Sequence, residues 1–212
     1  MSQPYSGEAV APAPLIPATA RGEATRRKLL HAAEEEFGSK GFHMASVSSV
    51  TQRAGVGQGT FYLYFHSKEE IFTTLVREIG HALRKQVTEA MATHPDRLDA
   101  ERAGLDSFLA FAAAHPGLYR IVQEAQFVDE PVFRDYYERI ANGYTLGLAA
   151  GVGRGEISEG NAELRAWLLM GIGHFLGMRY CLWEGKRPDA AAMDQVMDFI
   201  RHGLMPRGKA KK

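Results

Sequence analysis

The stretch AGVGQGTFYLYFHSKEE, residues 54–70, decides the fold of this chain because it places three glycines directly ahead of four aromatic rings. Gly55 predicts the end of a short helix over residues 47–54 that Ser46 caps, and a second short helix follows over residues 58–65. Gly55 and Gly57 are expected to shape the turn between the two helices. Two short helices joined in this way have the layout of a helix-turn-helix.

The second short helix has two different faces. At about 100° per residue, Phe61 and Phe65 point to the same inward side. Gln58 lies nearer that side by angle, although its long side chain at the helix start can swing outward. The opposite side carries Gly59, Thr60, Leu63, Tyr62 and Tyr64. Such a face suits a DNA major groove, where apolar groups contact thymine methyls and polar groups bind bases or phosphates.

Two helix starts near this face are candidate phosphate sites. Ser46 and Ser48 stand at the start of the first short helix, and Lys68 follows Ser67, which is expected to cap the next helix with Glu70 in a capping box. Free amides and the helix dipole attract anions at such positions. The alternative is an ordinary helical hairpin whose aromatic residues form core.

Residues 25–72 resemble the DNA-binding domain of the TetR family of bacterial repressors. The similarity covers TRRKLLHAAEEEFGSKGF and SVSSVTQRAGVGQGTFYLYFHSKEEIF. It implies DNA-facing positions for Gln58, Gly59, Thr60, Tyr62, Leu63, Tyr64 and Lys68, with Ser48 as a further candidate. Leu63 and Tyr64 stand where members often carry histidine, arginine or tryptophan, so the base sequence that the family reads does not transfer.

The remaining sequence predicts an all-α protein, because apolar residues recur at helical spacing and no segment alternates with period two. We expect a flexible tail over residues 1–21, a helix-turn-helix DNA-binding domain over 22–69, an effector-binding and dimerisation domain over 70–205, and a basic tail over 206–212. Helices are predicted at residues 22–39, 47–54, 58–65, 68–93, 98–114, 117–126, 131–152, 161–184 and 188–204.

The last two predicted helices suit pairing with a second copy. Apolar side chains occur nearly all round residues 166–180, and Gly171, Gly173 and Gly177 allow another helix to approach closely. The TetR resemblance implies a homodimer whose four-helix interface these two helices build. The alternative is that the glycines serve packing within one chain.

The middle helices are expected to hold a small-molecule effector, again by family resemblance. The composition favours an apolar or aromatic compound, and the family resemblance adds acyl compounds, although each residue taken singly is more often plain core. Arg120 and Arg134 are candidates to meet an acidic group. The candidate pocket residues are Phe108, Phe111, Tyr119, Val122, Phe127, Phe133, Tyr137, Tyr144, Trp167, Met170, His174 and Met178. Effector binding is expected to shift the population towards a conformation that no longer fits the operator.

Composition narrows the remaining classes. The chain has 25 basic residues (lysine and arginine) and 25 acidic residues (aspartate and glutamate). Residues 21–69 hold seven basic and five acidic residues, whereas residues 96–139 hold five basic and nine acidic residues. The single cysteine excludes an internal disulfide framework, and no apolar run is long enough to cross a membrane. We therefore expect a cytoplasmic regulator that binds double-stranded operator DNA and uses no cofactor. A helical enzyme or a protein-binding adaptor without DNA binding remains the rival class, although metal-ligand and phosphate-loop motifs are absent.

Overall fold

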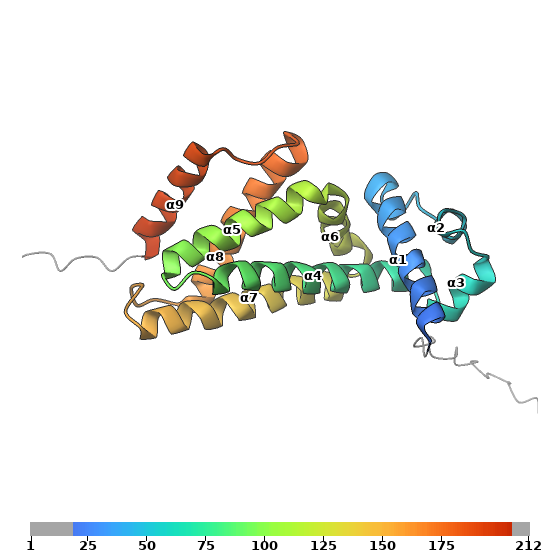
Figure 1. Cartoon of the computed structure of the whole chain (residues 1–212), viewed down its shortest axis with the longest axis horizontal. Helices are drawn as coiled ribbons and strands as arrows, with labels where there is room; N and C mark the ends of the chain where they lie inside the picture. The colour runs from blue at the N-terminus through green and yellow to red at the C-terminus, as the bar shows by residue number, and fades with distance from the viewer. Residues whose placement is uncertain (1–18, 205–212) are drawn as a thin grey trace, which may run out of the picture.

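The computed structural model describes residues 19–204, and all regular structure within them is helical. Figure 1 shows α1–α3 gathered at one end, with the long α4 running from them into a bundle that α5–α8 complete. The helices are α1 Ala20–Lys40, α2 Val47–Ala54, α3 Gln58–Tyr64, α4 Lys68–Ala92, α5 Arg97–Ala114, α6 Pro116–Val128, α7 Glu130–Gly153, α8 Ala162–Leu176 and α9 Ala190–Leu204, with a π-helix η1 at Gly177–Trp183. The predicted all-α class is confirmed.

The caps of the helix-turn-helix explain its boundaries. Ser46 accepts a hydrogen bond from the Ser49 amide, and the Ser49 hydroxyl accepts one from the Ser46 amide, which completes a capping box at α2. Gly55 then ends α2 at a φ of 67°, where a side chain would be strained. Gly57 has an ordinary φ of −76°. The turn therefore requires glycine at position 55 but not at position 57, contrary to our expectation.

The start of α4 differs in one detail from the predicted capping box. Ser67 caps the helix by accepting from the Glu70 amide at 3.2 Å. The Glu70 carboxylate, however, accepts from the amide of His66 rather than from that of Ser67. The cap therefore also fixes the residue that leaves α3, which ties the two helices together.

One apolar core joins the helix-turn-helix to the bundle. Phe37, Phe61, Phe65 and Phe72 are buried in the same cluster as Ile121 of α6. The predicted inward direction of Phe61 and Phe65 is confirmed. The predicted domain boundary after residue 69 falls inside α4, whose first turns belong to this shared core. A second cluster packs α5 against α8, η1 and α9.

The seam between α1 and α6 is unusually close. A Cβ added at Gly38 would lie 2.9 Å from the Cα of Gly117, so the two backbones touch. Farther along α6, the Glu124 carboxylate accepts a hydrogen bond of 2.8 Å from the amide of Phe42 in the α1–α2 loop. A helix of the bundle therefore holds the loop that precedes α2.

The predicted helix over residues 161–184 changes character at Gly177, where the backbone widens into η1. An added Cβ at Gly177 would lie 3.1 Å from the Phe108 ring, and one at Gly173 would lie 3.5 Å from Leu105. Both glycines are buried and pack against side chains of the same chain, which favours the packing alternative for them. Gly171 has open space around it and stays a candidate.

The predicted tails lie outside the described residues, except that Thr19 caps α1 and Ala20 and Arg21 belong to its first turn. Within residues 19–204, no helix combines the length and the apolar character needed to span a membrane.

A buried carboxylate joins α1 to α2 and gives a pH-dependent prediction. Glu36 is 2% exposed and receives hydrogen bonds of 2.7 Å from both Lys40 and Arg53. The bond from Lys40, followed by those from Arg53 and Ser49, lowers the pKa of Glu36 from 4.5 to about 2 despite its burial. A depressed carboxylate pKa stabilises the fold above the unfolded value and loses that effect as the pH falls.

We predict that Glu36→Gln lowers the free energy of unfolding at pH 7 by about 1–3 kcal/mol, the usual loss for hydrogen bonds to a charged group. Urea denaturation at pH 7 and at pH 3.5 should show the gap between parent and variant narrowing at the lower pH. Glu35→Gln, whose side chain is 45% exposed, is the control and should cost under about 1 kcal/mol. A gap that stays constant between the two pH values would contradict this explanation.

Candidate nucleic-acid interface and effector cavity

The outer face of α3 carries large apolar side chains in contact with solvent. Tyr62 and Leu63 are each 52% exposed, and Gln58 and Gly59 beside them are also exposed. An added Cβ at Gly59 would meet no neighbouring atom, so internal packing does not require this glycine. The buried Phe61 and Phe65 hold the helix from below. The face is thus held in place by the core but has no partner among residues 19–204.

Two of the predicted contact residues are less accessible. Thr60 is half-buried, and Tyr64 is half-buried and packs against the core cluster of α1–α4. Ser46 and Ser48 are exposed at the start of α2, although the Ser46 hydroxyl is already engaged in the capping box. The assignment of these side chains to DNA contacts stays a prediction.

Lys68 has a contact within the domain that the sequence did not predict. Its ammonium donates to the carbonyl oxygens of Phe42 at 2.9 Å and Ala45 at 3.0 Å, and it lies 4.2 Å from the centre of the Phe42 ring. Lys68 therefore holds the loop before α2 in this structure, and a phosphate contact would have to compete with these carbonyls.

Sequence reasoning did not single out the cations at the start of α1. Arg21, Arg27 and Lys28 are exposed and have no ion-pair partner among residues 19–204. In the same part of α1, the Arg26 guanidinium lies 5.8 Å from the centre of the Phe65 ring, which follows α3, and Figure 1 shows this part of α1 beside α3. By contrast, Arg53 and Lys40 are paired with Glu36 and have less charge to offer to a polyanion. The cluster of basic residues at positions 21–28 is the sequence feature that could have identified these cations.

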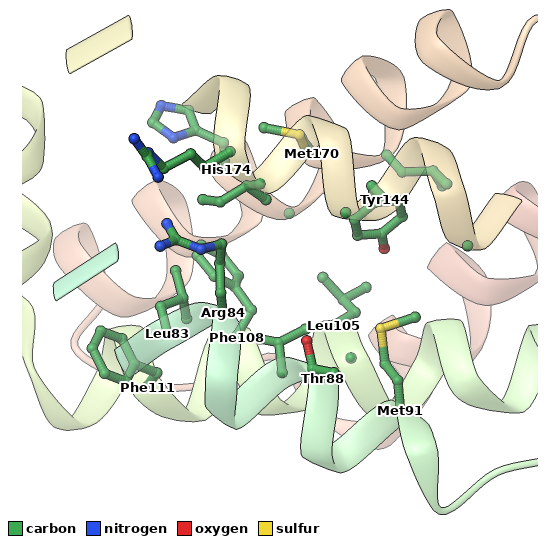
Figure 2. Close-up of a pocket in the computed structure, with 18 of the residues that line it drawn as sticks. Leu83, Arg84, Thr88, Met91, Leu105, Phe108, Phe111, Tyr144, Met170 and His174 are labelled. Atoms are coloured by element: carbon green, nitrogen blue, oxygen red, sulfur yellow. The ribbon is translucent and has the colours of Figure 1, made fainter. Parts of the chain in front are cut away.

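A cavity of about 540 Å³ lies between α4, α5, α6, α7 and α8. This is within the usual range for a small-molecule site. Figure 2 shows Leu83, Leu105, Phe108 and Met170 around the open space. Eight of the twelve predicted pocket residues line it, namely Phe108, Phe111, Tyr119, Val122, Tyr137, Tyr144, Met170 and His174.

The other four predicted pocket residues lie elsewhere. Phe127 is 80% exposed near the end of α6, and Trp167 is 43% exposed on α8. Phe133 packs edge-on against Tyr137 at 4.9 Å between ring centres, behind the cavity wall, and Met178 belongs to η1. These four side chains do not line this cavity, because helical spacing alone does not say which apolar face meets it.

Sequence reasoning missed the wall that α4 supplies. Ile79, Leu83, Val87 and Met91 line the cavity at a spacing of four residues, which is the stripe of one helix face. The stripe is visible in the sequence, but we did not include this helix among the candidate pocket residues. Arg84, on the same helix, also lines the cavity, whereas Arg120 and Arg134, the predicted cations, are exposed and do not.

Two polar groups interrupt the apolar wall. The Tyr119 hydroxyl donates to the backbone carbonyl of His174 at 2.7 Å and lies 3.1 Å from its Nδ1. Burial lowers the pKa of His174 and raises the pKa of Tyr137 to about 12. These side chains are therefore neutral at physiological pH and offer hydrogen bonds rather than charge.

The second polar group lies where α5 faces α7. Arg97 and Glu101 are both buried and form an ion pair, and the Tyr144 hydroxyl donates to the other oxygen of Glu101. Burial, and next the charge of Glu101, raise the pKa of Tyr144 well above its usual value. The phenol therefore keeps its proton and donates a hydrogen bond to Glu101, whose negative charge is already paired with Arg97.

Comparison with known proteins identifies the family. Residues 29–75 match the model for bacterial regulatory proteins of the tetR family. The uncharacterised HTH-type transcriptional regulator YdgC of Bacillus subtilis strain 168 is 30% identical over 191 residues, which cover 89% of this chain and 96% of that protein. The chain belongs to the TetR family of transcriptional regulators.

Solved structures share the whole architecture of this TetR-family chain. The fatty acid degradation regulator FadR from Bacillus halodurans has a TM-score of 0.74 at 21% identity, covering 83% of this chain and 94% of that chain. FadR from Bacillus subtilis, solved in complex with stearoyl-CoA, has a TM-score of 0.71 at 21% identity, covering 82% and 96%. These similarities show the fold, and the relatives are regulators rather than enzymes.

Proposed function

We propose that this TetR-family regulator is a homodimeric repressor that an amphipathic acyl compound releases from its operator. The observation that carries the proposal is the combination of an exposed, firmly mounted α3 face with a largely apolar cavity of about 540 Å³ in the same molecule. Reading chromosomal DNA would place the protein in the cytoplasm.

The proposed dimer rests on an apolar face of the two C-terminal helices. On α8, Leu164, Leu168 and Phe175 are each more than half exposed, and Gly171 lies between them at heptad-like spacing. Phe199 on α9 is 72% exposed. Large exposed apolar side chains gathered on neighbouring elements are typical of a protein interface. Two copies of α3 are also what a two-fold operator requires.

The shape of the cavity and the similarity to FadR support the choice of effector. The wall is formed mainly by aliphatic and aromatic side chains, with neutral hydrogen-bonding groups at His174 and at Tyr144. Such a wall favours a long apolar chain that carries few polar atoms. FadR from Bacillus subtilis, which shares the fold, was solved with stearoyl-CoA.

The proposed response uses α6 as the connection between cavity and reading helices. Val122 and Gln123 line the cavity, and the next residue, Glu124, accepts the hydrogen bond from the Phe42 amide. Phe42 and Ala45 in turn accept from Lys68, and Ser46 then caps α2. A ligand that moves α6 would therefore act on the loop that positions α2 and α3.

The DNA-binding part of the proposal predicts the effect of Tyr62→Ala. Duplexes selected from a random pool by the parent protein provide the operator, and fluorescence anisotropy measures its affinity. The variant should bind at least tenfold more weakly, because the exposed ring and hydroxyl are lost from the contact face. Its thermal unfolding should change little, since half of the ring is already in solvent.

The matched control is Phe127→Ala, which also removes an exposed aromatic ring but from α6. This variant should bind the operator as the parent does. A folded Tyr62→Ala protein with parental operator affinity would show that α3 does not read the DNA.

The connection through α6 predicts the effect of Glu124→Ala. The measured quantity is the ratio of operator Kd with saturating lauroyl-CoA to operator Kd without it. The ratio should be well above one for the parent and should fall towards one for the variant, because the bond from α6 to Phe42 is missing. Glu138→Ala, an exposed glutamate of α7, is the control. A parental ratio in Glu124→Ala would exclude this route.

A further inference from the structure

The charged side chains that line the large cavity are all arginines. Arg84, Arg97, Arg139 and Arg154 line it, and no aspartate or glutamate does so among residues 19–204. Three of these arginines form an ion pair with a carboxylate. Arg97 pairs with Glu101, Arg139 with Asp135 at 2.6 Å, and Arg154 with Glu156 at 2.6 Å. Arg84 is the exception.

Arg84 is also exceptional within the whole described chain. Arg26, Arg97, Arg102 and Arg165 are likewise partly or fully covered, and each has an ion-pair or hydrogen-bond partner. Arg84 is half-buried and has no such partner among residues 19–204. Partial loss of hydration without a hydrogen-bond partner costs free energy for a guanidinium. We therefore expect Arg84 to bind a group that this chain does not itself provide.

The surroundings of Arg84 form a basic recess beside the cavity. A smaller cavity of about 200 Å³ is lined by Arg77, Arg84, Arg139, Tyr136 and a single acid, Asp135. Arg84, Tyr136 and Arg139 line both cavities, so the two spaces adjoin at these residues. Asp135 is held by Arg139, and this hydrogen bond is the largest cause of its lowered pKa, with Arg77 and Arg84 adding their charge. The recess therefore carries three cations against one anion.

The backbone makes room for this arrangement. A Cβ added at Gly80 would lie 2.8 Å from the Tyr136 ring and 3.1 Å from Nη1 of Arg84. A side chain at position 80 would thus displace both groups. Figure 2 shows the Arg84 side chain directed from its helix into the pocket, with the hydrophobic labelled residues Leu83, Phe108 and Leu105 nearby.

We propose that Arg84, supported by Arg77 and Arg139, is the binding site for the anionic headgroup of the effector, whose apolar chain fills the large cavity. The inference rests on the proposed function and adds to it the polarity and orientation of the ligand. A charge-assisted hydrogen bond to Arg84 would supply the missing partner and is stronger than a neutral one. A carboxylate and a phosphate are both anions that accept such hydrogen bonds, and the probes below distinguish them.

Binding of three twelve-carbon probes to the full-length protein tests the site. Lauroyl-CoA, laurate and the uncharged dodecanol are titrated below their aggregation limits, with calorimetry as the readout, against the parent and Arg84→Met. The substitution keeps an apolar stem but removes the charge. We expect lauroyl-CoA, laurate or both to bind about tenfold more weakly to Arg84→Met, as the loss of about 1.4 kcal/mol implies, while dodecanol binding stays the same.

Two further variants sharpen the result. Arg84→Lys retains a cation and should recover part of the lost affinity. Arg120→Met removes an exposed arginine on α6 that also has no ion-pair partner among the described residues, and should change nothing. A loss confined to lauroyl-CoA would assign the recess to phosphate, and a loss for laurate would assign it to carboxylate.

The outcomes separate the headgroup site from the proposed function. Parental affinity of Arg84→Met for both charged probes, or an equal loss for dodecanol, would overturn the headgroup site while leaving an acyl effector in place. Failure of the parent to bind any of the three probes would instead overturn the acyl effector and the headgroup site with it.

Discussion

The close contact between α1 and α6 joins the helix-turn-helix to the helical bundle. Because the backbones of Gly38 and Gly117 touch, neither helix can rotate or carry a side chain at that point without moving the other. The hydrogen bond from the Phe42 amide to Glu124 fixes the same seam a few residues away. The core continues from Phe37 to Ile121 without a break. The helix-turn-helix and the cavity are therefore parts of one packed body.

The close packing of α1 against α6 supports the proposed response to a ligand. A tightly packed seam has few intermediate positions, so a small shift of α6 is transmitted rather than absorbed. The loop after α1 is the receiving element, since Phe42 contacts α6 through its amide and α4 through Lys68. The cavity wall includes residues of both α4 and α6. One ligand can thus act on the loop from two sides.

The helix-turn-helix could be predicted from sequence because its signals are local. Ser46, Gly55 and Ser67 fix helix ends by contacts with residues close by in the chain, and Phe61 and Phe65 follow from helix geometry. The position of Lys68 could not be predicted, because its partners Phe42 and Ala45 lie more than twenty residues away and are backbone carbonyls. The error at Gly57 had a different reason. The glycines of the turn look alike in the sequence, and only the structure shows that Gly55 has a positive φ while Gly57 does not.

The cavity was only partly predictable for a related reason. Aromatic residues such as Phe108 and Tyr119 line it, yet the equally aromatic Phe127 and Phe133 do not, because tertiary packing decides which helix face turns inward. The apolar stripe of α4 was visible in the sequence, but nothing local to it showed that it faces a cavity. Gly173 and Gly177 permitted close approach as expected, but the neighbour is Phe108 of the same chain rather than a second copy.

Hydrogen exchange at the Phe42 amide tests whether α6 transmits ligand binding to the loop before α2, because this amide is the donor in the bond to Glu124. Exchange is followed by NMR or mass spectrometry at residues 41–46, with and without saturating lauroyl-CoA, alongside operator affinity. We expect faster exchange at Phe42 under the conditions that weaken operator binding. Unchanged exchange at Phe42 while operator affinity falls would contradict it.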